Sequence, residues 1–85
     1  MIMWERIENN GGEKLVTELK FKNFDEAWEF MQKVALLAKE LNHHPNWHNS
    51  YNTVNIELTT HDLGNKISDK DILLSKKIKQ AYEKY

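Results

Sequence analysis

The spacing of the apolar residues changes at Asn23, and this change limits the folds that the chain can adopt. Over Lys14–Phe21 apolar side chains alternate with mostly polar ones, which is typical of a β-strand with one buried face and one wet face. From Phe24 to about Leu41 apolar residues instead recur at steps of three or four, as on one side of an amphipathic helix. Together the two patterns predict a sheet that helices cover on one side only.

Two more strands and a second helix complete the predicted order of elements. Met3–Glu8 precedes Asn9-Asn10-Gly11-Gly12, and Asn-Gly between two strands favours a tight hairpin because both residues tolerate positive φ. Tyr51–Thr60 alternates as a strand does, and Ser68 with Asp71 three residues later predicts the start of the last helix. The order strand, strand, helix, strand, helix indicates an α+β fold, an antiparallel β-sheet with two α-helices packed on one face.

Each helix is expected to bury one apolar face. At the start of the first helix Asn23 is the expected N-cap, and Glu26 is placed to reach back to it. The apolar face expected for this helix comprises Ala27, Trp28, Phe30, Met31, Val34, Ala35, Leu37, Ala38 and Leu41. The face expected for the last helix comprises Leu74, Ile78, Ala81, Tyr82 and Tyr85.

The composition narrows the classes of protein that this chain can represent. Its 85 residues suit a single domain, residues 1–85. Twelve basic residues against thirteen acidic ones give a net charge of −1, so no overall field attracts nucleic acid or an anionic membrane. The absence of cysteine excludes a disulfide framework and a thiolate metal site. With no signal-peptide pattern and no apolar stretch of about 20 residues, the expected location is cytoplasmic.

All four histidines lie between residues 43 and 61. Histidine has an unperturbed pKa of about 6.5 and can donate or accept a proton at cellular pH, so the cluster indicates general acid–base catalysis or metal binding. His43 and His44 precede Pro45 and should mark the exit from the first helix, because the residue before a proline is disfavoured in a helix. His61 follows the strand Tyr51–Thr60.

These histidines can meet only if the chain doubles back, because ten strand residues span about 33 Å. A turn around Asn49–Asn52 would lay His43 antiparallel beside His61, with a short edge strand at His44–His48. We therefore expect His43, His44 and His61 to share a pocket at the end of the sheet. The alternative is that they meet across a subunit interface.

The sequence around the fourth histidine, His48, favours neither a place in the site nor a role as a metal ligand. His48 lies near Asn46, Asn49 and Ser50, so we expect it to be an ordinary polar residue outside the site. His44-x₃-His48 has a spacing that zinc ligands use, but that spacing relies on a helix to align the pair, and this pair spans a proline. Without a cysteine or a second motif, we expect no metal site.

Longer motifs in the sequence resemble those of the pterin-4a-carbinolamine dehydratases. The segments that carry the resemblance are Phe21-Lys22-Asn23-Phe24, Ala27-Trp28-x-Phe30-Met31, Leu41-Asn42-His43-His44-Pro45, Trp47, Tyr51, Leu58-Thr59-Thr60-His61-Asp62-x-Gly64 and Asp71. The resemblance extends from about Trp4 to Ile78, and its most specific part is the combination of His-His-Pro with Thr-His-Asp. The fold that it implies is an α+β sandwich of the kind predicted above.

The resemblance implies dehydration of 4a-hydroxytetrahydrobiopterin to the quinonoid dihydropterin, in tetrahydropterin recycling, with neither a metal nor an organic cofactor. Loss of the 4a hydroxyl requires a proton, and the nitrogen at position 5 must release one as the C=N bond forms. By similarity, His43 and His61 are the acid–base groups and His44 holds the pterin ring. The resemblance also implies substrate contacts for Pro45, Thr60, Asp62 and Leu63.

In three respects the sequence departs from the family pattern. The usual N-terminal helix is expected to be missing, Lys39 stands where many members have a glutamate, and Gly64-Asn65 replaces the usual Gly-Gly. The family further implies a homodimer or homotetramer that binds a small-molecule pterin, with no nucleic acid or membrane as partner. A regulatory protein-binding module is the alternative, because animal relatives serve as dimerisation cofactors for a transcription factor. A histidine-ligated metal protein is a third possibility.

Overall fold

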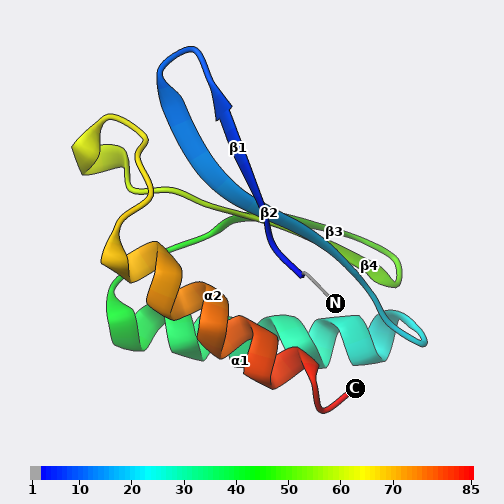
Figure 1. The fold of residues 1–85 in the computed structure, drawn as a ribbon. Helices are drawn as coiled ribbons and strands as arrows, with labels where there is room; N and C mark the ends of the chain where they lie inside the picture. Colours follow the sequence, from blue (N-terminus) through cyan, green and yellow to red (C-terminus); the bar gives the residue numbers. More distant parts are fainter. Residues whose placement is uncertain (1–2) are drawn as a thin grey trace.

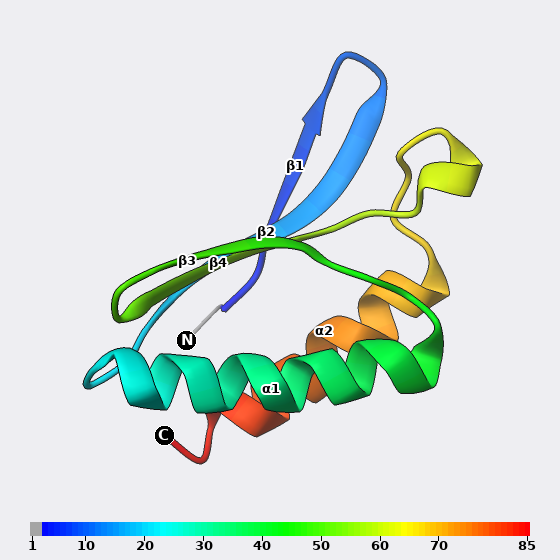
Figure 2. The same ribbon diagram turned by 180° about the vertical axis from the view of Figure 1, so that it is seen from behind.

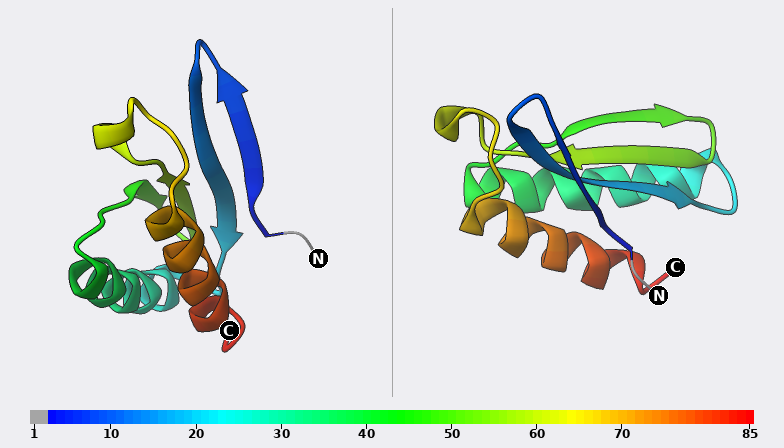
Figure 3. Two further views of the ribbon diagram at one scale, coloured as in Figure 1. Left: turned by 60° about the vertical axis from the view of Figure 1, so that its left-hand side comes forward. Right: turned by 45° about the horizontal axis from the view of Figure 1, so that its top comes forward.

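Four antiparallel strands in the order β1-β2-β4-β3 form one sheet in the computed structural model, which describes residues 3–85 (Figure 1). Both helices pack on the same face of this sheet (Figure 2, Figure 3), which confirms the predicted α+β architecture. The elements in chain order are β1 (Glu5–Asn9), β2 (Gly12–Lys20), α1 (Phe24–Leu41), β3 (Asn46–Ser50), β4 (Thr53–Leu58), the short 3-10 helix η1 (His61–Leu63) and α2 (Asp69–Tyr82).

The β1–β2 hairpin turns at Asn10-Gly11, as the sequence predicts. Both turn residues have positive φ, 50° for Asn10 and 78° for Gly11, which is the conformation that Asn and Gly tolerate best in a two-residue loop. β2 pairs with β1 on one side and with β4 on the other. The tip of the hairpin points away from the two helices (Figure 1).

β3 and β4 form a second hairpin, which confirms the expected edge strand but has a different register. A two-residue turn, Tyr51-Asn52, joins the strands. The sequence predicts His43 opposite His61, whereas the observed register, in which Asn46 pairs with Glu57, is shifted by one residue. The β3–β4 ladder ends at this pair. Beyond it, an isolated antiparallel bridge pairs Thr60, the residue before His61, with Lys66.

The two ends of α1 are set by asparagines. Asn23 is the N-cap, and its Oδ1 accepts a hydrogen bond of 2.9 Å from the backbone N–H of Glu26. The Glu26 carboxylate accepts from the backbone N–H of Lys22 at 3.0 Å, one residue before the predicted partner. α1 ends at Asn42, which has a left-handed φ of 51° and donates its N–H to the carbonyl of Ala38. The chain therefore leaves the helix directly before the histidine pair.

The core lies between the sheet and the two helices. Its buried apolar side chains are Leu15, Leu19, Phe21, Ala27, Phe30, Val34, Ala38, Val54, Ile56, Leu58, Leu74 and Ile78. The predicted face of α1 is wrong at Trp28 and Ala35, which are exposed, because the buried face centres on Phe30 and Val34. Tyr85 is likewise exposed, to 39%. Neither helix of the described residues combines the length and the apolar content needed to cross a membrane.

Candidate active site

Three segments that are distant in the sequence meet at one end of the sheet (Figure 2). They are the chain that leaves α1, the chain that leaves β4 and enters η1, and the first turn of α2. Between them lies a cavity of about 240 Å³. Its lining consists of Asn42, His43, His44, Thr59, Thr60, His61, Asp62 and Lys70.

This cavity brings together the three histidines on which the sequence analysis focused. His43 and His44 come from the exit of α1, and His61 comes from the first residue of η1. Thr60 and Asp62, two of the residues expected to bind substrate, also belong to the lining. The histidines therefore share one cavity within a single chain, while their catalytic role stays a prediction.

Other residues from the sequence analysis lie outside the lining. Pro45 and Leu63 were expected to contact substrate, but neither borders the cavity, and Leu63 is 57% exposed. His48 lies on β3, exposed, with its Nε2 3.2 Å from the side-chain nitrogen of Asn55. Among residues 3–85 no group of three or more His, Cys, Asp or Glu side chains is arranged to hold a metal ion.

A short polar contact at the cavity joins His43 to Asp71. Nε2 of His43 lies 2.5 Å from Oδ1 of Asp71, a short hydrogen bond to a carboxylate oxygen. Asp71 is fully buried, and the side chain of His43 is 11% exposed. A carboxylate can only accept, so Nε2 carries the hydrogen and Nδ1 is the ring nitrogen left for other chemistry.

Asp71 is held in its charged form by several donors. Its Oδ2 accepts hydrogen bonds from the Thr60 hydroxyl at 2.7 Å and from the backbone N–H of Ser68 at 2.9 Å. Burial opposes ionisation, but the hydrogen bonds from Thr60, His43 and Ser68 outweigh it and lower the pKa of Asp71 below its ordinary value of 3.8. The carboxylate is therefore ionised at neutral pH and presents a fixed negative charge to His43.

His61 has a different environment, exposed and on a short loop. Its Nδ1 lies 2.8 Å from Oδ1 of Asn65, whose backbone is left-handed with a φ of 63°. With the amide oxygen as acceptor, Nδ1 carries the hydrogen and Nε2 is free. The side chain of Asn65 thus orients the imidazole of His61.

The loop that carries His61 is tied to the β1–β2 hairpin through Glu13. The backbone N–H of Glu13 donates to the carbonyl of Asn65 at 2.7 Å, and the carbonyl of Glu13 accepts from the Thr59 hydroxyl at 2.7 Å. The Glu13 carboxylate also accepts from the backbone N–H of Ile67 at 3.2 Å. Polar contacts on both sides of η1 thus position His61, which no core packing holds.

Sequence reasoning missed what Asp71 and Asn65 do at the site. It placed Asp71 at the start of the last helix and among the residues that carry the resemblance, but gave it no role at the site. The order of elements nevertheless puts that helix start at the same end of the sheet as the exit of α1. A carboxylate at the third helical position next to a histidine segment was a usable signal. Asn65 offered none, because its contact with His61 depends on a left-handed backbone that is visible only in the structure.

Comparison with known families gives one result for nearly the whole chain. The sequence model of the family described as Pterin 4 alpha carbinolamine dehydratase matches residues 2–81. A protein of Synechococcus sp. (strain WH7803) is 55% identical over 65 residues, which cover 76% of this chain and 69% of that protein. One of Afipia carboxidovorans is 40% identical over 78 residues, which cover 92% and 77%. Both are named "Putative pterin-4-alpha-carbinolamine dehydratase".

Two solved structures have the same fold. A transcriptional coactivator/pterin dehydratase from Brucella melitensis superposes with a TM-score of 0.84 at 35% identity, covering 93% of this chain and 81% of that one. A pterin dehydratase-like protein described as a RuBisCO assembly factor in the alpha-carboxysome has a TM-score of 0.79 at 18% identity, covering 95% and 90%. At that identity the second likeness concerns the fold alone.

Proposed function

The chain belongs to the pterin 4 alpha carbinolamine dehydratase family, and from this premise we propose that it converts 4a-hydroxytetrahydrobiopterin to the quinonoid dihydropterin and water. The observation that carries the proposal is the position of His43, His44 and His61 around one cavity. The reaction moves two protons within a small volume, and imidazoles can both give and take protons near neutral pH.

The dehydration breaks the bond between C4a and its hydroxyl oxygen and forms a double bond between C4a and N5. Hydroxide is a poor leaving group, so an acid protonates the hydroxyl, which then departs as water. The lone pair of N5 forms the new bond, and a base removes the proton from N5. One proton enters and one leaves, so exchange with solvent resets both groups. Such acid–base assistance contributes about 10² to 10⁴-fold to the rate.

His43 suits one of these two roles. The buried carboxylate of Asp71 holds Nε2–H and fixes the plane of the ring, which leaves Nδ1 to exchange a proton with substrate. Asp71 is then a positioning residue, because it acts through His43. Thr60 supports the same arrangement by donating its hydroxyl hydrogen to Asp71.

His61 suits the other role, since Asn65 holds Nδ1–H and leaves Nε2 free. His44 is exposed at the cavity and would hold the pterin ring, with Thr60 and Asp62 as further contacts. Which of His43 and His61 acts as the acid depends on the epimer of the 4a carbon, because the hydroxyl leaves toward opposite faces of the ring.

The proposal is tested by the rate at which freshly generated 4a-hydroxytetrahydrobiopterin dehydrates. We expect the wild-type protein to accelerate the reaction above its spontaneous rate and His61→Ala to lose most of that acceleration, about 10²-fold. Stopped-flow absorbance that follows the quinonoid product would measure both.

His48→Ala is the matched control, because His48 is an exposed histidine on β3 outside the cavity. It should retain the wild-type rate. A His61→Ala protein that is as active as wild type, or a wild-type protein that adds nothing to the spontaneous rate, would rule out the assignment.

A regulatory binding module is the second candidate, favoured by the Brucella structure, which is described as a transcriptional coactivator as well as a pterin dehydratase. On α1, Trp28 and Leu36 expose 49% and 63% of their surface and would suit a protein partner. A module of this kind without catalysis would give the spontaneous dehydration rate, so the assay above separates the two candidates.

We also propose that the protein works as a homodimer or homotetramer in the cytoplasm, in the recycling of tetrahydropterin. The position of β3 at the edge of the sheet supports association. On its outer side, the backbone N–H and C=O groups of β3 have no strand partner among residues 3–85. Light scattering after size-exclusion chromatography should give a mass of two or four chains. The mass of a single chain at micromolar concentration would contradict this.

A further inference from the structure

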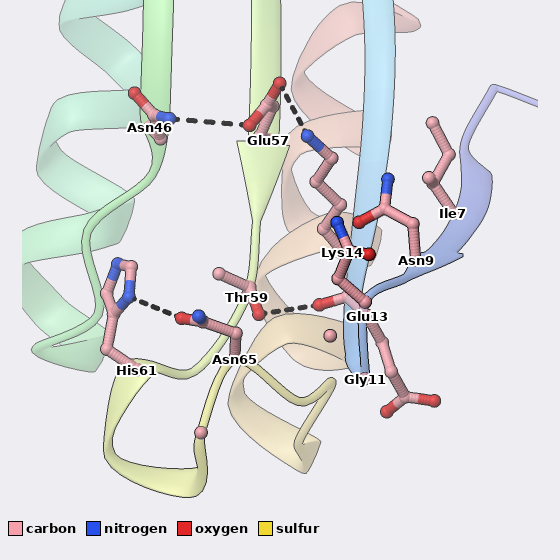
Figure 4. Close-up of a pocket in the computed structure, with 13 residues that line it drawn as sticks. Ile7, Asn9, Gly11, Glu13, Lys14, Asn46, Glu57, Thr59, His61 and Asn65 are labelled. Atoms are coloured by element: carbon pink, nitrogen blue, oxygen red, sulfur yellow. Dashed lines mark hydrogen bonds and ion pairs between the residues drawn. The ribbon is translucent and has the colours of Figure 1, made fainter.

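A second cavity, of about 380 Å³, adjoins the candidate site on the face of the sheet away from the helices (Figure 4). It lies between the β1–β2 hairpin, β4 and the loop at Gly64-Asn65. Thr59 and His61 line both this cavity and the first one. His61 therefore borders both the cavity in which the reaction is proposed and the second cavity, which has no part in the mechanism described above.

The covalent structure of a tetrahydropterin indicates which part of the substrate would lie in this second cavity. In a tetrahydropterin the carbon that bears the variable substituent, C6, is bonded to N5, and N5 is bonded to C4a. A group that exchanges a proton at C4a or N5 thus lies beside the first atoms of the C6 substituent. If His61 serves the reaction, the substituent begins at the wall that the two cavities share.

A chain of polar contacts across β2, β4 and β3 lines this second cavity (Figure 4). Glu57 of β4 is central, with Oε2 3.2 Å from Nζ of Lys14 on β2. Its Oε1 accepts a longer hydrogen bond, 3.4 Å, from the amide of Asn46 on β3. The two donors hold the carboxylate from opposite sides. Each carboxylate oxygen has about two acceptor sites, so each retains one for a further hydrogen bond.

A carboxylate with two adjacent free acceptor sites matches a ligand with two adjacent hydroxyl groups. The Glu57 side chain is 40% exposed and Lys14 is 35% exposed, so a ligand can reach them. Ile7, on β1, adds apolar surface to the same lining, which suits a terminal methyl group. A 1,2-dihydroxypropyl group has both features.

We propose that the second cavity binds the C6 substituent of the pterin and that Glu57 selects substituents with two adjacent hydroxyls. The inference rests on the proposed function and deepens it, because it assigns the residues that would recognise the C6 substituent of that substrate. Lys14 and Asn46 position the Glu57 carboxylate, and His61 marks the boundary between ring and substituent.

The test compares two substrates, the 4a-hydroxy forms of tetrahydrobiopterin and of 6-methyltetrahydropterin, which lacks the hydroxyls. The wild-type protein should favour the first in kcat/KM, chiefly through KM, because these contacts are remote from the bond changes. Glu57→Gln should lower that preference about tenfold, the effect of losing a hydrogen bond to a charged group. Glu18→Gln, a surface carboxylate of β2 outside this cavity, should leave the preference as it is.

The outcomes separate this inference from the proposed function. A wild-type protein that dehydrates both substrates with equal kcat/KM, or an unchanged preference in Glu57→Gln, overturns the inference and leaves the dehydratase assignment standing. A wild-type protein that dehydrates neither overturns both. Calorimetry on the wild-type protein provides a readout that needs no variant: 7,8-dihydrobiopterin should bind about tenfold more tightly than 6-methyl-7,8-dihydropterin, and equal affinities would contradict the inference.

Discussion

At the scale of single residues, Asp71 links the start of α2 to the candidate site. The same carboxylate accepts from the backbone of Ser68 at the start of the helix and from the ring of His43. Because it is fully buried, it has no water to replace a lost partner. Helix capping and orientation of a histidine therefore depend on one side chain.

Replacing Asp71 by asparagine should disturb the orientation of the His43 ring more than the binding of substrate. The amide keeps the shape but loses the charge that holds Nε2–H of His43, so we expect kcat to fall about tenfold or more while KM changes less. Asp69→Asn is the matched control, since Asp69 is an exposed carboxylate in the same helical turn. Steady-state kinetics on both variants check this, and equal kcat in Asp71→Asn and wild type would contradict it.

The lowered pKa of Asp71 also predicts how stability depends on pH. A carboxyl group whose pKa is lower in the folded state stabilises that state above its unfolded pKa, about 4, and this contribution is lost as the pH falls through the folded value. The free energy of unfolding of the wild type should thus fall more steeply below pH ~4 than that of Asp71→Asn. Urea titrations across this range measure both, and parallel pH profiles would refute the prediction.

At the scale of elements, the sequence predicted both α-helices and all four strands, but it missed the short helix η1 and misplaced one register. Tight turns and helix caps require particular residue types, which can be recognised in a sequence. Asn10-Gly11 therefore predicts the first hairpin, and Asn23 and Ser68 predict the starts of the two helices. The β3–β4 register depends on where the chain turns, and Asn49–Asn52 offers several polar residues for that turn. The structure uses Tyr51-Asn52, which no propensity for turns would favour over its neighbours.

The sequence predicted which histidines gather at the site but not which residues hold their rings. Residue types and the need for a turn bring His43, His44 and His61 to one end of the sheet, and the structure places them around one cavity. For Asp71 the sequence offered a signal, its place at the start of the last helix, but the contact with His43 depends on the packing of α2. The contact of Asn65 with His61 was not predictable, because it depends on a left-handed loop residue. Long-range contacts of this kind leave no periodic pattern in a sequence.

The turn at Tyr51 carries a measurable strain. Tyr51 has a φ of 50° and is 66% exposed, so it holds an unfavourable backbone conformation with few contacts in return. Tyr51→Gly should raise the free energy of unfolding by about 0.5–1 kcal/mol, because glycine adopts this conformation without steric cost. Tyr51→Val should lower it, since a β-branched residue fits there worst. Chemical denaturation measures both, and a less stable glycine variant would contradict the argument.

At the scale of the whole molecule, stability rests on one apolar layer between the sheet and the helices. Phe30 is fully buried at its centre, and its ring lies 4.9 Å from that of Phe21 between centroids. Trp28, only two residues earlier on α1, is 49% exposed. A chain of this size has about 4–13 kcal/mol of stability, so a single large cavity in this layer removes a large part of it.

Phe30→Ala should therefore lower the free energy of unfolding by about 3–5 kcal/mol. Trp28→Ala should lower the free energy of unfolding far less, because about half of the Trp28 surface is already in contact with water. Urea denaturation of the two variants compares them directly. Equal losses would mean that Trp28, as the sequence pattern suggested, belongs to the core after all.

The molecule as a whole brings the end of α1, the end of β4 and the start of α2 to one place, and the central claim is that the pterin reacts there. The most direct measurement is a crystal structure with 7,8-dihydrobiopterin, a stable isomer of the proposed product. We expect the pterin ring in the cavity of His43, His44 and His61, with imidazole nitrogens within about 3 Å of N5 or of the oxygen site on C4a. A pterin bound elsewhere, with none of these imidazoles facing C4a, would contradict it.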